Sequence, residues 1–196
     1  MKVHIIGKGN VGSALADRAA AVGHTITISN SATESGQVAT DIAAADLTVL
    51  AVPHAAIADF SAEIKEAFRG RTVVDATNPL TADFMGLTVG YTSSGGEQVA
   101  ETLPGAHVVK AFSSVLAPQH ASPEAAPGTK LFVPVASDDL TAKKQVLEFA
   151  CSLGFDAVDA GVLANARFIE PATELLIHLA YGQGLGAGIG FALTRA

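Results

Sequence analysis

Short apolar runs alternate along the chain with longer segments in which apolar residues recur every three or four positions. Seven runs have the length and composition of strands, at 2–6, 25–29, 47–52, 72–76, 107–112, 131–136 and 155–160. Helical spacing occupies four segments between them, at 13–22, 56–68, 95–103 and 139–153. Strands that alternate with helices and are mostly apolar predict an α/β fold, with a Rossmann-like, doubly wound and mostly parallel sheet covered on both faces.

Two stretches depart from this alternation. Residues 30–46 alone separate the second strand from the third, where a doubly wound fold places a helix and a further strand. We expect this αβ unit to be trimmed to a loop or a single turn. The helical pattern at 163–181 contains Pro171, which should kink or split the helix, and a glycine-rich tail follows. We therefore expect a first domain at 1–161 and a small helical C-terminal extension at 162–196, packed over the sheet edge or on another subunit.

The composition narrows the class of partner. Of the 196 residues 49% are hydrophobic and 16% are charged, against about 25% charged in average soluble domains, which indicates a buried sheet or a subunit interface. A net charge of −7 with 12 lysines and arginines provides no basic stripe for nucleic acid. The chain has no apolar run of the ~18 residues that a membrane span needs, and no signal-peptide pattern. We expect a cytoplasmic protein that binds small molecules and no membrane.

A glycine-rich turn lies directly between the first strand and the first helix, with the sequence Gly7-Lys8-Gly9-Asn10-Val11-Gly12. Without a Cβ, Gly7 can turn off the strand, Gly9 lets the backbone approach a pyrophosphate, and Gly12 lets the helix pack on the sheet. The N–H groups and dipole at the start of that helix favour an anion. We interpret 1–161 as a dinucleotide-binding domain; a purely structural glycine turn is the alternative.

Special residues gather at the ends of five strands. They are the turn at 7–12, Ser29-Asn30-Ser31, Val52-Pro53-His54, Ala76-Thr77-Asn78-Pro79 and Phe112-Ser113-Ser114. Because the carboxyl ends of parallel strands meet at one edge of a sheet, we expect these residues around a single ligand crevice.

The end of the second strand selects the cofactor. NAD enzymes usually carry an acidic residue there, which binds the ribose 2′-hydroxyl and would repel a 2′-phosphate. Ser29, Asn30 and Ser31 are neutral donors instead, and Lys8 adds positive charge, so the sequence favours NADP(H) over NAD. The missing acid also argues against a methyltransferase, whose cofactor ribose generally needs one.

None of the familiar catalytic constellations is present in the sequence, which has no GxSxG, HExxH or SxxK motif and no paired-carboxylate motif. We therefore name no catalytic residue and no metal ligand. This pattern fits hydride transfer, in which the cofactor carries the chemistry and the protein supplies orientation and shielding from water.

The histidines are interpreted one by one. His54 follows a strand end, where it either contacts the ligand or caps the next helix. His4 and His107 belong to strands and are interpreted as structural. His120 lies in the proline-rich stretch 117–129, which reads as an exposed loop that could cover the site, and is a lesser candidate for substrate contact.

Two further side chains have structural interpretations. Lys110, inside a strand, either snorkels to solvent at the edge of the sheet or is buried with a partner such as Asp75 or Glu97, and we favour the ion pair. The single cysteine, Cys151, excludes an internal disulfide and a cysteine metal cluster, and its helical spacing predicts a buried structural thiol.

Several stretches together resemble one family. They are 2–15 (KVHIIGKGNVGSAL), 50–53 (LAVP), 74–80 (VDATNPL), 108–113 (VVKAFS), 159–170 (DAGVLANARFIE) and 179–186 (LAYGQGLG). On these motifs the chain is similar, nearly from end to end, to the NADP oxidoreductases related to the deazaflavin (coenzyme F420)-dependent NADP reductase.

The resemblance implies a Rossmann domain with a small helical C-terminal part, NADP(H) along the strand ends, and a flat second redox partner stacked on the nicotinamide. Hydride then passes between the rings without an obligatory acid or base. The implied contacts are Gly9, Asn10 and Val11 for the pyrophosphate, Ser29 and Asn30 for the 2′-phosphate, Val52 and His54 for the ribose side, and Asn78, Ala111 and Phe112 for the nicotinamide. We add Ala51, Pro53, Ile57 and Pro79 as cofactor contacts, and Ser113, Gly184 and Leu185 as substrate contacts.

The chain departs from the family's pattern beyond the trimmed αβ unit. Ser29-Asn30 stands where a Ser-Arg pair is common, Ser113-Ser114 where Asn-Thr is found, and Ala187-Gly188 where a charged pair is often found. The second redox partner therefore stays open among coenzyme F420, a flavin, and a carbonyl or imine. We expect an NADP(H)-dependent oxidoreductase that forms a homodimer through its apolar tail; a non-catalytic NADP(H) sensor and an imine or carbonyl reductase are the alternatives.

Overall fold

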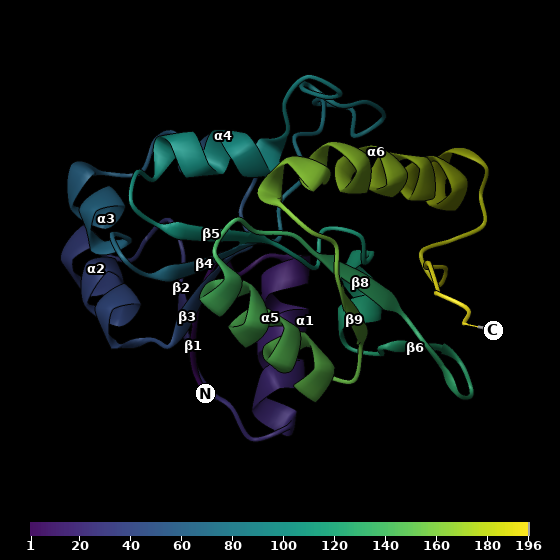
Figure 1. The fold of residues 1–196 in the computed structure, drawn as a ribbon, viewed down its shortest axis with the longest axis horizontal. Helices are drawn as coiled ribbons and strands as arrows, with labels where there is room; N and C mark the ends of the chain where they lie inside the picture. Colours follow the sequence, from purple (N-terminus) through teal and green to yellow (C-terminus); the bar gives the residue numbers. More distant parts are fainter. Residues whose placement is uncertain (196) are drawn as a thin grey trace.

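The centre of the molecule is a parallel β-sheet (Figure 1). The computed structural model describes residues 1–195, with the backbone alone of residue 125. Across the sheet, the strands of this range are β2 (Thr25–Ser29), β1 (Lys2–Ile6), β3 (Leu47–Leu50), β4 (Thr72–Asp75) and β5 (His107–Lys110). All neighbours are parallel, so the prediction of a parallel sheet is confirmed. The chain runs outward from β1 to β2 and returns past β1 to β3, which places a topological switch point between β1 and β3.

A second parallel pair extends the sheet beyond β5. β8 (Phe132–Val135) pairs with β9 (Asp156–Asp159), and an antiparallel bridge between Lys110 and Ala136 joins the pair to β5. The strands predicted at 131–136 and 155–160 are thus present, but they form a separate pair and not two further strands of one parallel sheet.

Helices cover both faces of the main sheet (Figure 1). They are α1 (Asn10–Ala21), α2 (Ser35–Ala44), α3 (Ala62–Ala67), α4 (Gly95–Thr102) and α5 (Leu140–Ser152), with α6 (Ala166–Ile177) at the end of the chain. Alternate residues of β1 face opposite sides: Ile5 belongs to the core that α1 and α5 cover, and Ile6 to the core under α2, α3 and α4. Burial on both faces explains why the strands are apolar along their length.

The stretch 30–46 contains a helix, α2, so the expectation of a loop or a single turn was wrong. Val38 and Ile42, four residues apart, are buried against the sheet, and this spacing stabilises a helix despite its polar start. Within the described residues α2 leads directly to β3, without the outer strand that a doubly wound fold adds beyond β2. The unit is therefore trimmed by a strand and keeps its helix.

The proline-rich stretch 117–129 folds against the body of the protein. It contains a 3₁₀ turn, η2 (Ala117–His120), followed by β6 (Glu124–Ala126) and β7 (Thr129–Lys130), which form a short antiparallel pair. The η2 turn lies against α1, and His120 is 0% exposed. The loop was expected to be exposed and able to cover the site, and for η2 this was wrong, because the buried imidazole holds the turn against the core.

The C-terminal part is helical, as predicted. A 3₁₀ turn, η3 (Leu163–Asn165), leads into α6, which continues as a π-helical turn, η4 (His178–Gly182). Pro171 lies inside α6 and does not split it; the helix type changes at Asn165, before the proline, and at His178, after it. No helix within residues 1–195, α6 included, is both long enough and apolar enough to cross a membrane.

The glycine-rich tail packs on the protein's own surface. Ala187, Ile189 and Phe191 contact the small apolar cluster between η2 and α6. The backbone N–H of Phe132 donates to the carbonyl of Phe191 at 2.8 Å, so the tail runs beside β8.

Cys151 is exposed on the outer side of α5, so the prediction of a buried thiol was wrong. The face of α5 that packs on the sheet carries Val146, Phe149 and Ala150. Because successive helical residues point about 100° apart, Cys151 is turned away from this face although its neighbour is buried.

Candidate functional site

A cavity of about 910 Å³ opens at the carboxyl ends of β1, β3, β4 and β5. It lies at the topological switch point, where the strand-end argument places the ligand. The predicted site residues that line it are Gly9, Asn10, Val11, Ala51, Val52, Pro53, His54, Asn78, Pro79 and Ser113. The structure thus brings four of the five strand ends into one crevice.

Gly7 and Gly12 are required by packing, whereas Gly9 is not. A Cβ on Gly7, whose φ is +120°, would collide with the carbonyl of Ala51, and a Cβ on Gly12 would collide with the carbonyl of Gly7. At Gly9, none of the described atoms lies within 4 Å of the point that a Cβ would occupy, and the residue faces the cavity. A glycine there leaves room for something other than the protein.

The N-terminus of α1 is open toward this space. Gly9 is its N-cap, and in the described structure the helix has no side-chain cap and no acidic residue in its first turn. The first N–H groups of an α-helix have no partner within the helix, so they are available to an anion, and the helix dipole favours one.

The end of β2 divides into a buried and an exposed part. Ser29 is 1% exposed, and its Oγ lies 3.1 Å from Nε2 of His4. Burial lowers the pKa of His4, which is therefore a neutral hydrogen-bonding group beneath the site. Asn30 and Ser31 are exposed, and Oδ1 of Asn30 accepts from the N–H of Ala32. Only the exposed pair is available to a ligand.

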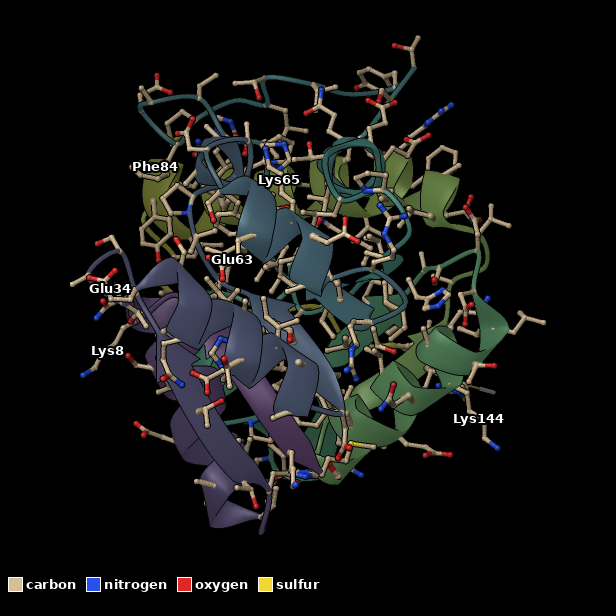
Figure 2. All side chains as sticks on the ribbon, turned by 90° about the vertical axis from the view of Figure 1, so that its left-hand side faces the viewer. Lys8, Glu34, Glu63, Lys65, Phe84 and Lys144 are labelled. Carbon is tan, nitrogen blue, oxygen red and sulfur yellow. The ribbon has the colours of Figure 1, made fainter. Side chains whose placement is uncertain are left out.

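Charged side chains of both signs surround this strand end. Figure 2 shows Lys8 and Glu34 along the same edge of that view, with Lys8 projecting into solvent. Both residues are exposed.

His54 stands at the edge of the cavity in a hydrogen-bonded chain. Its Nδ1 lies 3.2 Å from Oγ1 of Thr77, and the Thr77 hydroxyl donates to Oδ1 of Asp75 at 2.7 Å. Its Nε2 lies 3.0 Å from Oε1 of Gln98. His54 begins a 3₁₀ turn, η1 (His54–Ile57). Its ring lies between Thr77, which follows β4, and Gln98 on α4.

Lys110 is fully buried behind this chain. Its Nζ lies 2.9 Å from Oδ2 of Asp75 and 2.8 Å from Oε1 of Glu170, and donates to the carbonyl of Thr77 at 2.6 Å. Burial alone would lower the pKa of Lys110, but the two carboxylates outweigh it and raise that pKa, so the lysine is charged. The predicted partner Asp75 is confirmed; the alternative, Glu97, pairs with Arg167.

The carboxylate of Glu170 links α6 to the rest of the protein. Besides Lys110, it accepts from the backbone N–H groups of Gly95 and Gly96 at 2.8 and 3.0 Å, at the start of α4. A negative charge at a helix N-terminus is favourable. The element that closes one side of the cavity is therefore fixed to the sheet through a buried ion-pair network.

The inner wall of the cavity combines two unpaired polar groups with apolar side chains. Within the described residues, Oδ1 of Asn78 and Oγ of Ser113 are buried without a hydrogen-bond partner, while Nδ2 of Asn78 donates to the carbonyl of Ser113. The apolar part of the wall is made by Leu80, Phe84, Met85, Val115, Leu116, Ile177 and Tyr181. Such a wall suits a flat heteroaromatic ring that carries an amide-like group.

Other predicted site residues lie outside the described lining of this cavity. Gly7 and Gly12 support the turn, and Ile57 lines a second cavity of about 480 Å³ beside His54. Ala111 and Phe112 are 0% and 1% exposed, and the Phe112 ring belongs to the core. Lys8, Ser29, Asn30, Ser31, Gly184 and Leu185 are also outside it, and Leu185 is 61% exposed.

Several lining residues were not selected from the sequence. Asp83, Phe84, Met85 and Thr88 come from the segment after β4, which shows no periodicity or motif. Thr77 belongs to the strand-end stretch Ala76-Thr77-Asn78-Pro79, so its position next to Asn78 could have identified it as a lining residue. Thr173, Ile177 and Tyr181 come from α6 and the turn that follows, and only the fold brings them to this edge.

The chain matches a known family and a solved structure. Residues 2–79 match the family described as NADP oxidoreductase, coenzyme F420-dependent. A crystal structure of a candidate F420-dependent NADP reductase from Arthrobacter sp. FB24 is 31% identical, superposes with a TM-score of 0.87, and matches over 100% of both chains.

Two curated relatives are F420-dependent NADP reductases. The protein of Methanothermobacter marburgensis is 32% identical over 148 residues, and that of Methanothermobacter thermautotrophicus is 35% identical over 144 residues. The matches cover 69% and 70% of this chain but only 62% and 61% of the relatives' own length.

Proposed function

The chain belongs to the family of coenzyme F420-dependent NADP oxidoreductases, and from this membership we propose that it is an NADP(H)-dependent oxidoreductase. The nicotinamide exchanges a hydride with a second, flat redox partner. The observation that carries the proposal is the free space at Gly9 in front of the uncapped N-terminus of α1, which opens into the cavity. A pyrophosphate supplies both the bulk and the negative charge that this position accepts.

The nicotinamide lies at the other end of the cavity in this proposal. Asn78 and Ser113 line this end, and a rotation of their side chains would let Oδ1 of Asn78 accept from the NH₂ of the carboxamide and the Ser113 hydroxyl donate to its carbonyl. Both protein groups are buried without a partner among the described residues, so a ligand that pairs with them removes a desolvation cost of about 1–3 kcal/mol for each.

NADP(H) is proposed over NAD(H) because of the end of β2. Asn30 and Ser31 are exposed neutral donors, and Lys8 adds an exposed charge in the glycine turn. Ser29 supports the end of the strand from beneath and does not contact the phosphate, since its hydroxyl is directed to His4. The exposed acid Glu34 opposes a 2′-phosphate only through water, where the interaction of two charges is weak.

A deazaflavin is the proposed second partner. The two curated relatives are named for coenzyme F420, and the apolar wall of Phe84, Met85 and Leu116 suits a flat ring stacked on the nicotinamide. The extension 162–196, proposed as a unit distinct from 1–161, closes this side of the cavity through Ile177 and Tyr181. A flavin is the proposed second choice.

A homodimer is proposed through the outer face of α6. Phe168 and Leu175, seven residues apart on the same face of the helix, are 73% and 56% exposed. Two such side chains favour contact with another apolar surface. Light scattering coupled to size exclusion should give twice the mass of one chain, and Phe168→Glu should give the mass of one.

The proposal is tested by binding. Calorimetric titration of NADPH should show one site per chain, with NADH weaker. Gly9→Asp places a carboxylate at the anion site and should weaken NADPH binding by about tenfold or more. Gly188→Asp is the matched control, because Gly188 is exposed and also has no described atom near its Cβ position. Equal NADPH affinity in both variants contradicts the proposal.

Turnover separates the alternatives. NADPH oxidation should occur with coenzyme F420 and more slowly with riboflavin. Binding of NADPH without turnover on either acceptor indicates a sensor. Turnover on a cyclic imine or a ketone, and on neither tricyclic acceptor, indicates an imine or carbonyl reductase.

A further inference from the structure

A continuous hydrogen-bonded chain connects the buried ion pair to the edge of the cavity. It runs from Nζ of Lys110 to Asp75, from Asp75 to the Thr77 hydroxyl, and from that hydroxyl to Nδ1 of His54, with distances of 2.9, 2.7 and 3.2 Å. Asp75, Thr77 and Lys110 are buried, whereas the histidine is half-buried. Thr77 and His54 both line the main cavity, and the chain ends on the more exposed of the two, His54.

The direction of each hydrogen bond follows from chemistry. The Asp75 carboxylate is held by the charged Lys110 and by the N–H of Thr77, at 2.9 Å each, so it is ionised and can only accept. The single proton of the Thr77 hydroxyl must then point to Asp75. The Thr77 oxygen is left to accept, and Nδ1 of His54 must carry a proton. Nε2 is therefore the nitrogen of His54 that gains and loses a proton.

Nε2 lies beside the second cavity. His54 lines both the main cavity and the second cavity of about 480 Å³, and Gln98, which lies against Nε2, lines the second one. The Gln98 side chain, 3.0 Å away, has an amide that accepts from Nε2–H in one orientation and donates to a bare Nε2 in the other. The site therefore tolerates both protonation states.

The packing around the His54 ring leaves no room for a side chain at position 95. A Cβ on Gly95 would lie 3.2 Å from Cε1 of His54, 3.0 Å from Cδ of Pro79 and 3.2 Å from Oε1 of Glu170. These contacts are tighter than side chains normally make, so a residue larger than glycine would displace the histidine or its supports.

We propose that His54 is the proton donor to the second redox partner and that Thr77 is the positioning residue that fixes its tautomer. The proposal rests on the proposed function. The C4–H bond of NADPH breaks, and its hydride forms a C–H bond on the acceptor. The two electrons leave an anionic nitrogen or oxygen on the acceptor, which takes the proton from Nε2–H as that N–H bond breaks. The products are NADP⁺ and the fully reduced acceptor, and solvent returns a proton to Nε2.

Other groups around the cavity fit this role less well. Asp83 accepts from the hydroxyl of Thr81 and from the N–H of Met85, which lower its pKa, so it is ionised and has no proton to give. Tyr181 is 59% exposed at the cavity's edge. Charged groups surround His54 on three sides. Asp75 is linked to it through the Thr77 hydroxyl, and Lys110 and Glu170 lie behind Asp75. Glu101 lines the second cavity, and Asp83 lines the main one.

The experiment is the pH dependence of kcat/KM for coenzyme F420 reduction by NADPH. The wild-type rate should fall as pH rises, because only the protonated form of His54 can give the proton. His54→Gln removes the titrating nitrogen and should lower kcat by about 10²-fold and abolish this break, since general acids contribute 10²–10⁴-fold. Thr77→Val should move the break and slow turnover, and Thr77→Ser, which keeps the hydroxyl, should restore both.

Controls separate this inference from the proposed function. His107→Gln, at the opposite end of β5, should keep rate and pH profile. NADPH affinity is measured by calorimetry in every variant, because the loss of a cofactor contact raises KM for NADPH, whereas the loss of a proton donor lowers kcat at saturating NADPH. An unchanged break in His54→Gln, an unchanged kcat at saturating NADPH in that variant, or a loss of the break in Tyr181→Phe overturns the inference. Failure of the wild-type protein to bind NADPH overturns the proposed function instead.

Discussion

Replacing His120 by leucine should make the protein more resistant to acid. The His120 ring is 0% exposed, and its centroid lies 6.3 Å from those of Phe112 and Phe155. Neither ring nitrogen has a hydrogen-bond partner in the described part of the chain. Burial lowers the pKa of His120 from 6.5 to about 4, an effect that the nearby backbone of Val115 only partly offsets.

The size of the effect follows from proton linkage. The unfolded chain takes up a proton on this imidazole near pH 6.5, whereas the folded protein keeps it neutral down to about pH 4. Between these values the unfolded state binds more protons, so the free energy of unfolding falls as pH falls. Above pH 6.5 this group has no effect. One pH unit corresponds to about 1.4 kcal/mol, so the folded protein loses about 2.5 kcal/mol by pH 4.5 and about 3 kcal/mol by pH 4.

Urea denaturation at pH 7.5 and pH 4.5 measures this difference. Circular dichroism is the suitable signal, because the chain contains no tryptophan. Wild type should lose about 2.5 kcal/mol more than His120→Leu between the two pH values. His107→Gln, which removes a histidine paired with Asp139 at the surface, should lose as much as wild type. Equal losses in wild type and His120→Leu would refute the reasoning, because the buried imidazole would then be protonated in the folded state.

Three further predictions concern charge and capping. Lys110→Met leaves two buried carboxylates without their cation and should lower the free energy of unfolding by about 3–5 kcal/mol. Arg167→Met, at a partly exposed ion pair, should lower it by about 1 kcal/mol or less. Similar losses for the two variants in urea denaturation would contradict this prediction. Lys8→Ala should weaken NADPH binding by about tenfold at low salt, with little effect on NADH binding. The same loss of NADPH affinity at high salt would contradict the electrostatic role of Lys8. Ser94→Ala removes the cap of α4 and should destabilise the protein by about 1 kcal/mol in thermal melts, while Ser94→Thr, which keeps the hydroxyl, should destabilise it less.

The local elements were largely predictable. The strand at 2–6, the glycine turn and the helix after it follow from φ/ψ requirements and from spacing within about twenty residues. The capping interaction of Ser94 with Glu97 is likewise a contact between near neighbours. In each case the residues that decide the structure lie next to one another in the chain.

The candidate site was predictable in outline and not in detail. The strand-end rule located the crevice and eleven of its lining residues, because parallel strands share one carboxyl edge. The same rule selected Phe112, whose φ of +64° turns its ring into the core. It gave no sign of Phe84 or Tyr181, since the segments that carry them have no pattern of their own.

The sequence by itself determined the strands, most of the helices between them, the glycine turn and the family, because these depend on backbone preferences and on motifs within short stretches. The tertiary structure alone decided which side chains meet. It brought Glu170 to Lys110 across 60 positions, buried His120 among aromatic rings, and joined His54 to Asp75 through Thr77. Such contacts depend on how whole elements pack against one another, and no local spacing in the chain encodes that packing.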